Sequence, residues 1–244
     1  MIRPDFAGME FLRRRFFIAL MPAILMLLML LSVGMASSAI TAKQALGKAS
    51  RNYDIINDYT VDAQLSIDSP SIQIPKTNVK IYFKKPDKVH VESKDGLAIL
   101  PKHGLLTGNP VKEFASADEL SITGSARVDG RDCYVIRANF TKSQRPVESM
   151  VWIDKKDWLV MRISANPGYG PSVDVTLKYL KTEGKYWLPV YTKAKLSIPP
   201  MTRMHGRMNP GAPQPSTAII RFSNYRVNKG ISDSVFIEKL ERGN

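Results

Sequence analysis

From residue 59 onwards, apolar residues recur at every second position of this chain, and this alternation limits the fold to one built mainly from β-strands. In one such segment, Val79, Ile81 and Phe83 fall on one side of the strand while Lys80 falls on the other. Turns rich in Pro, Gly, Asn and Asp separate most of the segments, which predicts an antiparallel sheet. The nine predicted strands cover residues 59–68, 78–84, 88–93, 132–140, 148–154, 158–165, 172–180, 186–198 and 217–227.

Helical periodicity is confined to three short stretches. They are 41–56, 109–120 and 232–240. Thr41 can cap the first of these helices, and Leu46 lies on its apolar stripe. We therefore expect a mainly β (α+β) fold, in which the N-terminal helix and one or two short helices cover a strongly curved antiparallel sheet. With so few helices, either the apolar side keeps a partly open hollow or the curled sheet fills itself with its own side chains.

The first 36 residues have the order of an export signal. Arginines at 13–15 precede an uncharged apolar run over 16–33, and small residues follow up to Ala36. We expect a signal peptide that is cleaved near Ala36 and a periplasmic protein with one domain over 37–244. An uncleaved N-terminal anchor is the alternative, because the apolar run just reaches the length of about 17 residues that spans a bilayer.

The chain is strongly basic, with 35 Lys and Arg against 22 Asp and Glu and a formal net charge of +13. On an exported protein, this charge favours anionic lipid surfaces or acidic partners, and no nucleic acid is expected as a partner. The alternative interpretation is a surface whose charge serves solubility.

Few residues are suited to catalysis or metal binding. The single cysteine excludes an intrachain disulfide, and the three histidines lie far apart and form no zinc-binding helix. Asp154 and Asp157 flank a short hairpin and are expected to shape that turn, while Cys133 is expected to be a small core residue. We therefore expect no enzyme, no catalytic residues, no metal and no cofactor.

One stretch, residues 199–215, differs from the rest because it is rich in proline and methionine and is predicted to be a loop insertion. Within it, Met201, Met204 and Met208 recur at helical spacing beside basic residues. This spacing predicts an adaptable apolar face that contacts lipid chains or a partner. A mobile insertion between two strands is the alternative.

Several short motifs after the first helix occur in a characteristic order. They are Tyr59-Thr60-Val61-Asp62-Ala63-Gln64, Val79-Lys80-Ile81-Tyr82-Phe83-Lys84-Lys85-Pro86-Asp87-Lys88, Val151-Trp152-Ile153-Asp154, Trp187-Leu188-Pro189 and Phe222-Ser223-Asn224-Tyr225. Together with the export signal, they resemble the outer-membrane lipoprotein carrier family of LolA type, also described as outer membrane lipoprotein-sorting proteins. The resemblance covers nearly all of 37–244.

The resemblance implies an incomplete antiparallel barrel closed by helices, whose apolar hollow binds the acyl chains of lipoproteins and carries them across the periplasm towards the outer membrane. It implies an acylated lipoprotein or another lipid as ligand, an inner-membrane donor, an outer-membrane acceptor and a monomeric carrier. The family has an arginine before the strand-end proline that hydrogen-bonds to the lid, and Lys85 occupies that position, with the first helix as the lid. The expected acyl-chain contacts are Val79, Ile81, Phe83, Val89, Val91, Val175, Leu177 and Tyr179.

Two other functions stay open. The same fold serves in periplasmic sensors of RseB type, which respond to lipids or lipoproteins and bind a membrane regulator, although such chains usually carry a second domain. An exported hydrolase would need two carboxylates, or a histidine and an acid, brought together in one cleft.

Overall fold

The computed structural model describes residues 39–70, 74–93, 109–141, 147–166, 172–198, 201–204, 207–210 and 214–237. The expected signal peptide, 1–36, lies outside these residues. The chain divides into two units at Ala39, and the following description concerns the second unit alone, Ile40–Asn244. No helix in the described part of the chain is both long enough and apolar enough to span a membrane.

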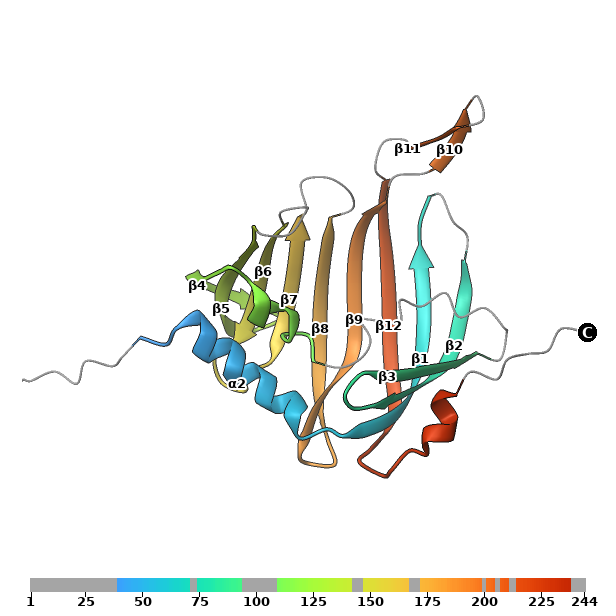
Figure 1. Ribbon diagram of the computed structural model, residues 1–244, viewed down its shortest axis with the longest axis horizontal. Coiled ribbons are helices and arrows are strands. Elements are labelled where there is room, and N and C mark those ends of the chain that lie inside the picture. The colour runs from blue at the N-terminus through green and yellow to red at the C-terminus, as the bar shows by residue number, and fades with distance from the viewer. Residues whose placement is uncertain are drawn as a thin grey trace, which may run out of the picture. The chain divides into compact units, whose positions relative to one another are not determined.

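Ten strands of the second unit form one antiparallel sheet (Figure 1). Their order across the sheet is β3-β2-β1-β12-β9-β8-β7-β6-β5-β4, so β3 and β4 are the two edges and the sheet does not close into a barrel. The bounds are β1 Asp58–Asp68, β2 Ile74–Lys84, β3 Lys88–Ser93, β4 Glu119–Val128, β5 Arg131–Phe140, β6 Val147–Asp154, β7 Val160–Asn166, β8 Val173–Thr182, β9 Tyr186–Ile198 and β12 Gln214–Val227. The prediction of a mainly β fold with an incomplete antiparallel barrel is confirmed.

The predicted first helix is present as α2, Ala42–Asp54. The Thr41 hydroxyl accepts a hydrogen bond from the Gln44 amide, and the Gln44 side chain accepts one from the Thr41 amide, so a capping box fixes the start of the helix. Its apolar stripe faces the sheet, and α2 lies against β4, β6 and the short 3₁₀ turn η1.

Over the described ranges, the other two predicted helices are present only as short 3₁₀ turns. The stretch 109–120 contains only η1, Glu113–Ser116, because the chain must enter β4 at Glu119. The described part of 232–240 contains only the 3₁₀ turn η2, Asp233–Phe236. Two ion pairs from Asp233, to Lys84 at 2.8 Å and to Lys88 at 3.1 Å, hold η2 against the turn between β2 and β3.

Three strands were not predicted. Edge strand β4 has partly buried Leu120, Ile122, Ala126 and Val128 separated by exposed residues, and none of its residues is fully buried. The other two, β10 Met201–Met204 and β11 Arg207–Pro210, pair with each other as a separate hairpin within 199–215. Because a strand repeats every two residues, the helical spacing predicted for the methionines does not apply to them.

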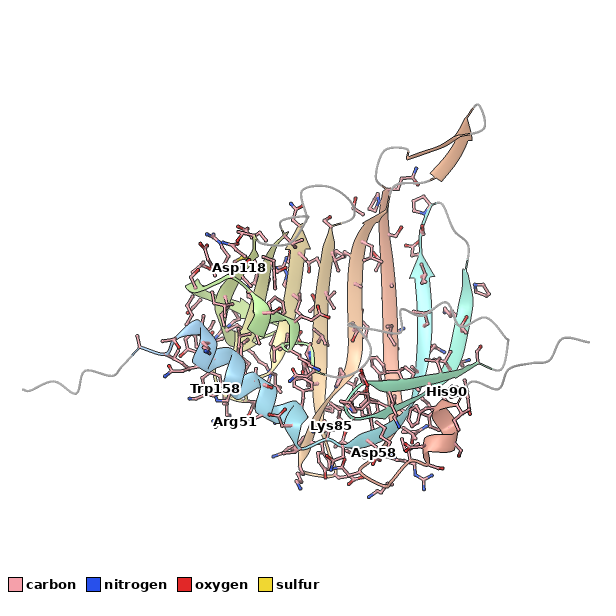
Figure 2. The ribbon with its side chains drawn as sticks, viewed as in Figure 1. Arg51, Asp58, Lys85, His90, Asp118 and Trp158 are labelled. Carbon is pink, nitrogen blue, oxygen red and sulfur yellow. The ribbon has the colours of Figure 1, made fainter. Side chains whose placement is uncertain are left out.

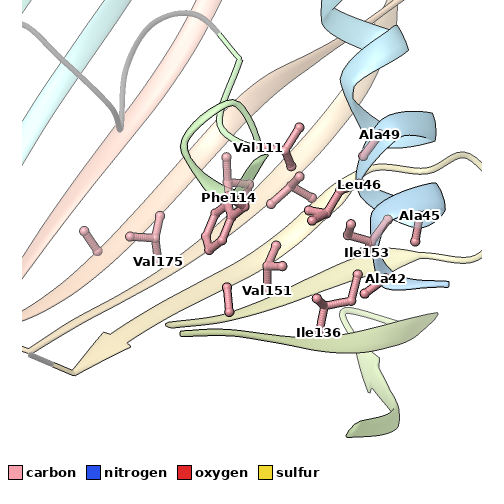
Figure 3. Close-up of a cluster of buried hydrophobic side chains, with 14 residues drawn as sticks. Ala42, Ala45, Leu46, Ala49, Val111, Phe114, Ile136, Val151, Ile153 and Val175 are labelled. Atoms are coloured by element: carbon pink, nitrogen blue, oxygen red, sulfur yellow. The ribbon is translucent and has the colours of Figure 1, made fainter. Parts of the chain in front are cut away.

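The inner face of the sheet carries two separate apolar clusters. The helix-side cluster lies under α2 and η1 and includes Leu46, Phe114 and Val151 (Figure 3). The hairpin-side cluster, named after the β2–β3 hairpin, joins β1, β2 and β12 and includes Val61, Ile81 and Phe222. Each end of the sheet is therefore covered by a core of its own.

Arg131 organises the turns at one end of the sheet. Asp129 and Gly130 have φ of 49° and 79°, as a tight Asp-Gly hairpin turn requires. Arg131 then donates to Asp154 at 3.0 Å and to Asp157 at 2.7 Å, and Asp154 also accepts from the Asp157 amide at 2.6 Å. The two carboxylates thus shape the turn between β6 and β7, as predicted. They also neutralise the charge of Arg131.

Replacing Arg131 by Ala should lower the free energy of unfolding by about 2–3 kcal/mol, because the Asp154 side chain is 3% exposed and loses its cation. Arg127→Ala is the matched control, since Arg127 pairs with Asp132 at the exposed surface and such pairs contribute about 0–1 kcal/mol. Urea unfolding of both variants measures the difference. Equal losses would show that Asp154 does not depend on Arg131.

Candidate functional site

The middle of the inner face carries small side chains. In one cross-strand row, Val175 of β8, Ala194 of β9 and Ala218 of β12 lie side by side. In the next row, Thr192 of β9 lies between Leu177 and Ile220. We name the central floor for its four small residues, Thr192, Ala194, Ser216 and Ala218.

This floor lies where the two clusters adjoin, with Ala194 a member of the helix-side cluster and Ala218 packed against it. Leu177, on one side of Thr192, belongs to the helix-side cluster, and Ile220, on the other side, belongs to the hairpin-side cluster. Small residues at this point keep the two cores from meeting as a single layer of large side chains. The arrangement suits an apolar molecule that lies across β9 and β12 and contacts both clusters.

The eight predicted acyl-chain contacts all lie on the inner face, but in two groups. The first group belongs to the hairpin-side cluster and comprises Val79, Ile81, Phe83, Val89 and Val91. The second belongs to the helix-side cluster and comprises Val175, Leu177 and Tyr179. Ile81 is 0% exposed and Phe83 is 4% exposed, so both side chains are packed within the hairpin-side cluster.

Hydrogen bonds fasten the C-terminal half of α2 to the rest of the domain. Asn52 donates to the carbonyl oxygens of Asp157 and Trp158 at 2.9 and 3.1 Å, and the hydroxyls of Tyr53 and Tyr179 are 2.9 Å apart. Ahead of η1, Asn109 donates to the hydroxyl of Ser50 at 2.7 Å. The apolar stripe of the helix, by contrast, consists of three alanines and one leucine.

Lys85 contacts the end of the same helix. Its ammonium group donates to the carbonyl oxygen of Asp54, the last residue of α2, at 2.5 Å, and Figure 2 shows it beside the lower end of α2. A cation at this position suits the negative end of the helix dipole. The residue expected at the lid contact is therefore placed against the first helix.

The hydroxyl pair of Tyr53 and Tyr179 is partly buried. Burial raises the pKa of Tyr53 to about 12, and burial also raises the pKa of Tyr179 well above its ordinary value of 10.0. Both hydroxyls therefore stay protonated at neutral pH, and Tyr179 donates onwards to the carbonyl oxygen of Val160 at 3.0 Å. The pair acts as a neutral polar link in an otherwise apolar region.

The clefts outside the inner face are polar. One of about 1030 Å³, where β1, β2, β3 and β12 meet, is bordered by Val79 but also by Asp62, Lys80 and Glu92. Another, of about 370 Å³, has a basic lining that includes Lys193 and Lys195. Polar linings of this kind do not match an acyl chain.

Other groups relevant to catalysis are held in structural roles. Cys133 is 0% exposed, and burial raises the pKa of its thiol to about 11, as expected for a core residue. The described residues contain no group of three or more His, Cys, Asp or Glu side chains that is able to hold a metal ion.

The central floor was not predicted from the sequence. Ala194 and Ala218 belong to strands that the alternation predicted, and their small size was the available signal. Its meaning depends on the pairing of β9 with β12, which brings these residues side by side.

No family model matches this chain, and no curated protein matches it. Solved structures do resemble it. A DUF1329 family protein from Desulfovibrio piger is 17% identical, with 81% of this chain and 97% of the other covered and a TM-score of 0.52. A LolA superfamily protein from Nitrosomonas europaea is 11% identical, with 82% of this chain and 99% of the other covered and a TM-score of 0.52. An outer membrane lipoprotein-sorting protein domain from Vibrio parahaemolyticus is 12% identical, with 80% of this chain and 97% of the other covered and a TM-score of 0.51. The protein has a LolA-like fold, as the motifs predicted.

Replacing Lys85 by Met should loosen the end of α2, because the carbonyl of Asp54 loses its charged donor. We expect about 5-fold faster hydrogen exchange of the amides in the last turn, which corresponds to one hydrogen bond of about 1 kcal/mol. Lys88→Met is the control, since Lys88 pairs with Asp233 and not with the helix. Unchanged exchange in Lys85→Met would mean that this contact does not hold the helix.

Proposed function

We propose that this protein is a periplasmic carrier that binds the acyl chains of lipoproteins, or of other lipids, across the inner face of its curved sheet. The observation that carries the proposal is the central floor. A wide apolar face has a group of small side chains in its middle, and most of its large side chains are packed toward the two ends. An acyl chain is a ligand of matching shape and chemistry, and burial of each of its methylenes contributes about 0.8 kcal/mol.

Helix α2 is suited to act as the lid of this carrier. Its buried face offers little apolar area, because Ala42, Ala45 and Ala49 accompany a single Leu46. Its firm contacts are polar and lie near its C-terminal end, at Lys85 and the partners of Asn52 and Tyr53. The helix can therefore lift at its N-terminal end while these contacts keep it attached.

The likeness to LolA-like proteins supports the proposal at the level of the fold. Through that likeness the proposal includes export to the periplasm, binding without catalysis, and exchange of the ligand between an inner-membrane donor and an outer-membrane acceptor.

A matched pair of peptides tests the proposal. The full-length protein is expressed in a bacterium, recovered from the periplasm without detergent and mixed with a synthetic triacylated lipopeptide or with the same peptide lacking acyl chains. Native mass spectrometry should detect a complex with the acylated peptide alone. Equal binding of both peptides, or of neither, would contradict the proposal, and the sensor that binds a membrane regulator would become the leading interpretation.

Replacing Ala218 by Phe should obstruct the proposed lipid site, because Ala218 lies on the central floor and is only partly buried. Exclusion of two to three methylenes removes about 2 kcal/mol of binding free energy, which is a loss of roughly 30-fold in affinity. Thr217→Phe places the same ring on the opposite face of β12 and should bind as the parent does. Affinity is measured by titration with a fluorescent fatty acid.

If both variants bind the fatty acid as the parent does, the ligand does not use the central floor. If both lose affinity equally, the effect comes from damage to β12 and not from obstruction of the lipid site. Unfolding temperatures of the two variants show whether each is folded.

A further inference from the structure

The central floor contains a buried hydroxyl that forms no hydrogen bond. Thr192 is 1% exposed, and in the part of the chain that the structure describes, its Oγ1 is the buried side-chain polar atom left without a partner. The side chains of its cross-strand neighbours, Leu177 and Ile220, are apolar and can neither donate nor accept a hydrogen bond. An unsatisfied hydroxyl in such surroundings costs free energy, so its presence calls for an explanation.

Two other buried hydroxyls on the same face are satisfied. Ser216, also on the floor, donates to the hydroxyl of Ser69 at 2.9 Å. Thr77, on β2, donates to the carbonyl oxygen of Pro75 at 3.0 Å. A missing partner is therefore not a general property of this face.

We propose that Thr192 donates a hydrogen bond to the ester or amide carbonyl oxygen of the bound lipid. This inference rests on the proposed function and adds a ligand class and an orientation to it. Within an acylated lipid, the first acceptor next to the methylenes is this carbonyl oxygen, whereas the hydrocarbon itself cannot accept a hydrogen bond.

The position of Thr192 also defines how the lipid lies. The helix-side cluster begins at Leu177 and the hairpin-side cluster begins at Ile220, on opposite sides of the hydroxyl. A carbonyl held at Thr192 allows two acyl chains to diverge, one toward each cluster. The ligand class is therefore a diacyl lipid or a lipid-modified peptide, with its glycerol region over β9.

Two phospholipids that differ only in their ester carbonyl groups test this inference. A diester phosphatidylglycerol and its diether analogue share chain length and head group, but the diether lacks both carbonyl oxygens. Transfer of each lipid from vesicles to the full-length protein gives the two affinities. The parent should prefer the diester by about 3- to 10-fold, the range expected for one neutral hydrogen bond.

Removing the hydroxyl should abolish this preference. In Thr192→Val, affinity for the diester falls to that for the diether, whereas Thr192→Ser retains the preference. Thr176→Val makes the same change on the outer face of the neighbouring strand β8 and should also retain it. Thr192→Ala removes the same hydroxyl and serves if the valine variant folds poorly.

Stability gives an independent readout. Without lipid, Thr192→Val should raise the unfolding temperature by about 2–4 °C, because it removes a buried polar group that has no partner. A parent protein that binds both lipids equally, or a valine variant that keeps the preference, would overturn the role of Thr192 and leave the carrier intact. Binding of neither lipid would overturn the carrier proposal and this inference together.

Discussion

The structure depends on how a wide sheet with one apolar face covers that face. Ten strands provide the face, and within the described residues a single α-helix of 13 residues is available to cover it. Because β3 and β4 stay unpaired with each other, closure into a barrel does not solve the problem. The chain instead builds one core under α2 and η1 and a second where β1, β2 and β12 meet. The small residues of the central floor lie where the two cores adjoin.

Local alternation predicted most of the sheet, because it reports directly which side of a strand is buried. The bounds of β3 and β9 agree with the prediction residue for residue. Strand β4 was missed although Leu120, Ile122, Ala126 and Val128 alternate with polar residues, and its first two residues were assigned to the helix predicted over 109–120. The helix predicted over 109–120 failed for a related reason, since its last residues were required as the start of that edge strand.

Long-range pairing explains what the sequence could not provide about the site. Val79 and Val175 were both recognised as inward-facing, yet they lie in different clusters because three strands separate β2 from β8 in the sheet. Ala194 and Thr192 look ordinary within β9, and they matter only because β12, which returns after the β10–β11 hairpin, lies beside them. The position of Lys85 was available from the resemblance, but its contact with the last carbonyl of α2 required the folded chain.

For the proposed carrier, the balance between holding and releasing a lipid can be argued from these contacts. Five hydrogen bonds fasten α2, through Asn52 twice and through Ser50, Tyr53 and the carbonyl of Asp54. At about 1 kcal/mol each, their complete loss would offset the burial of about six methylenes. A longer chain still binds favourably, so water alone does not extract it. Release therefore requires a competing apolar surface, and the apolar contacts of the buried face of α2, which re-form when its N-terminal end closes, make that transfer less costly.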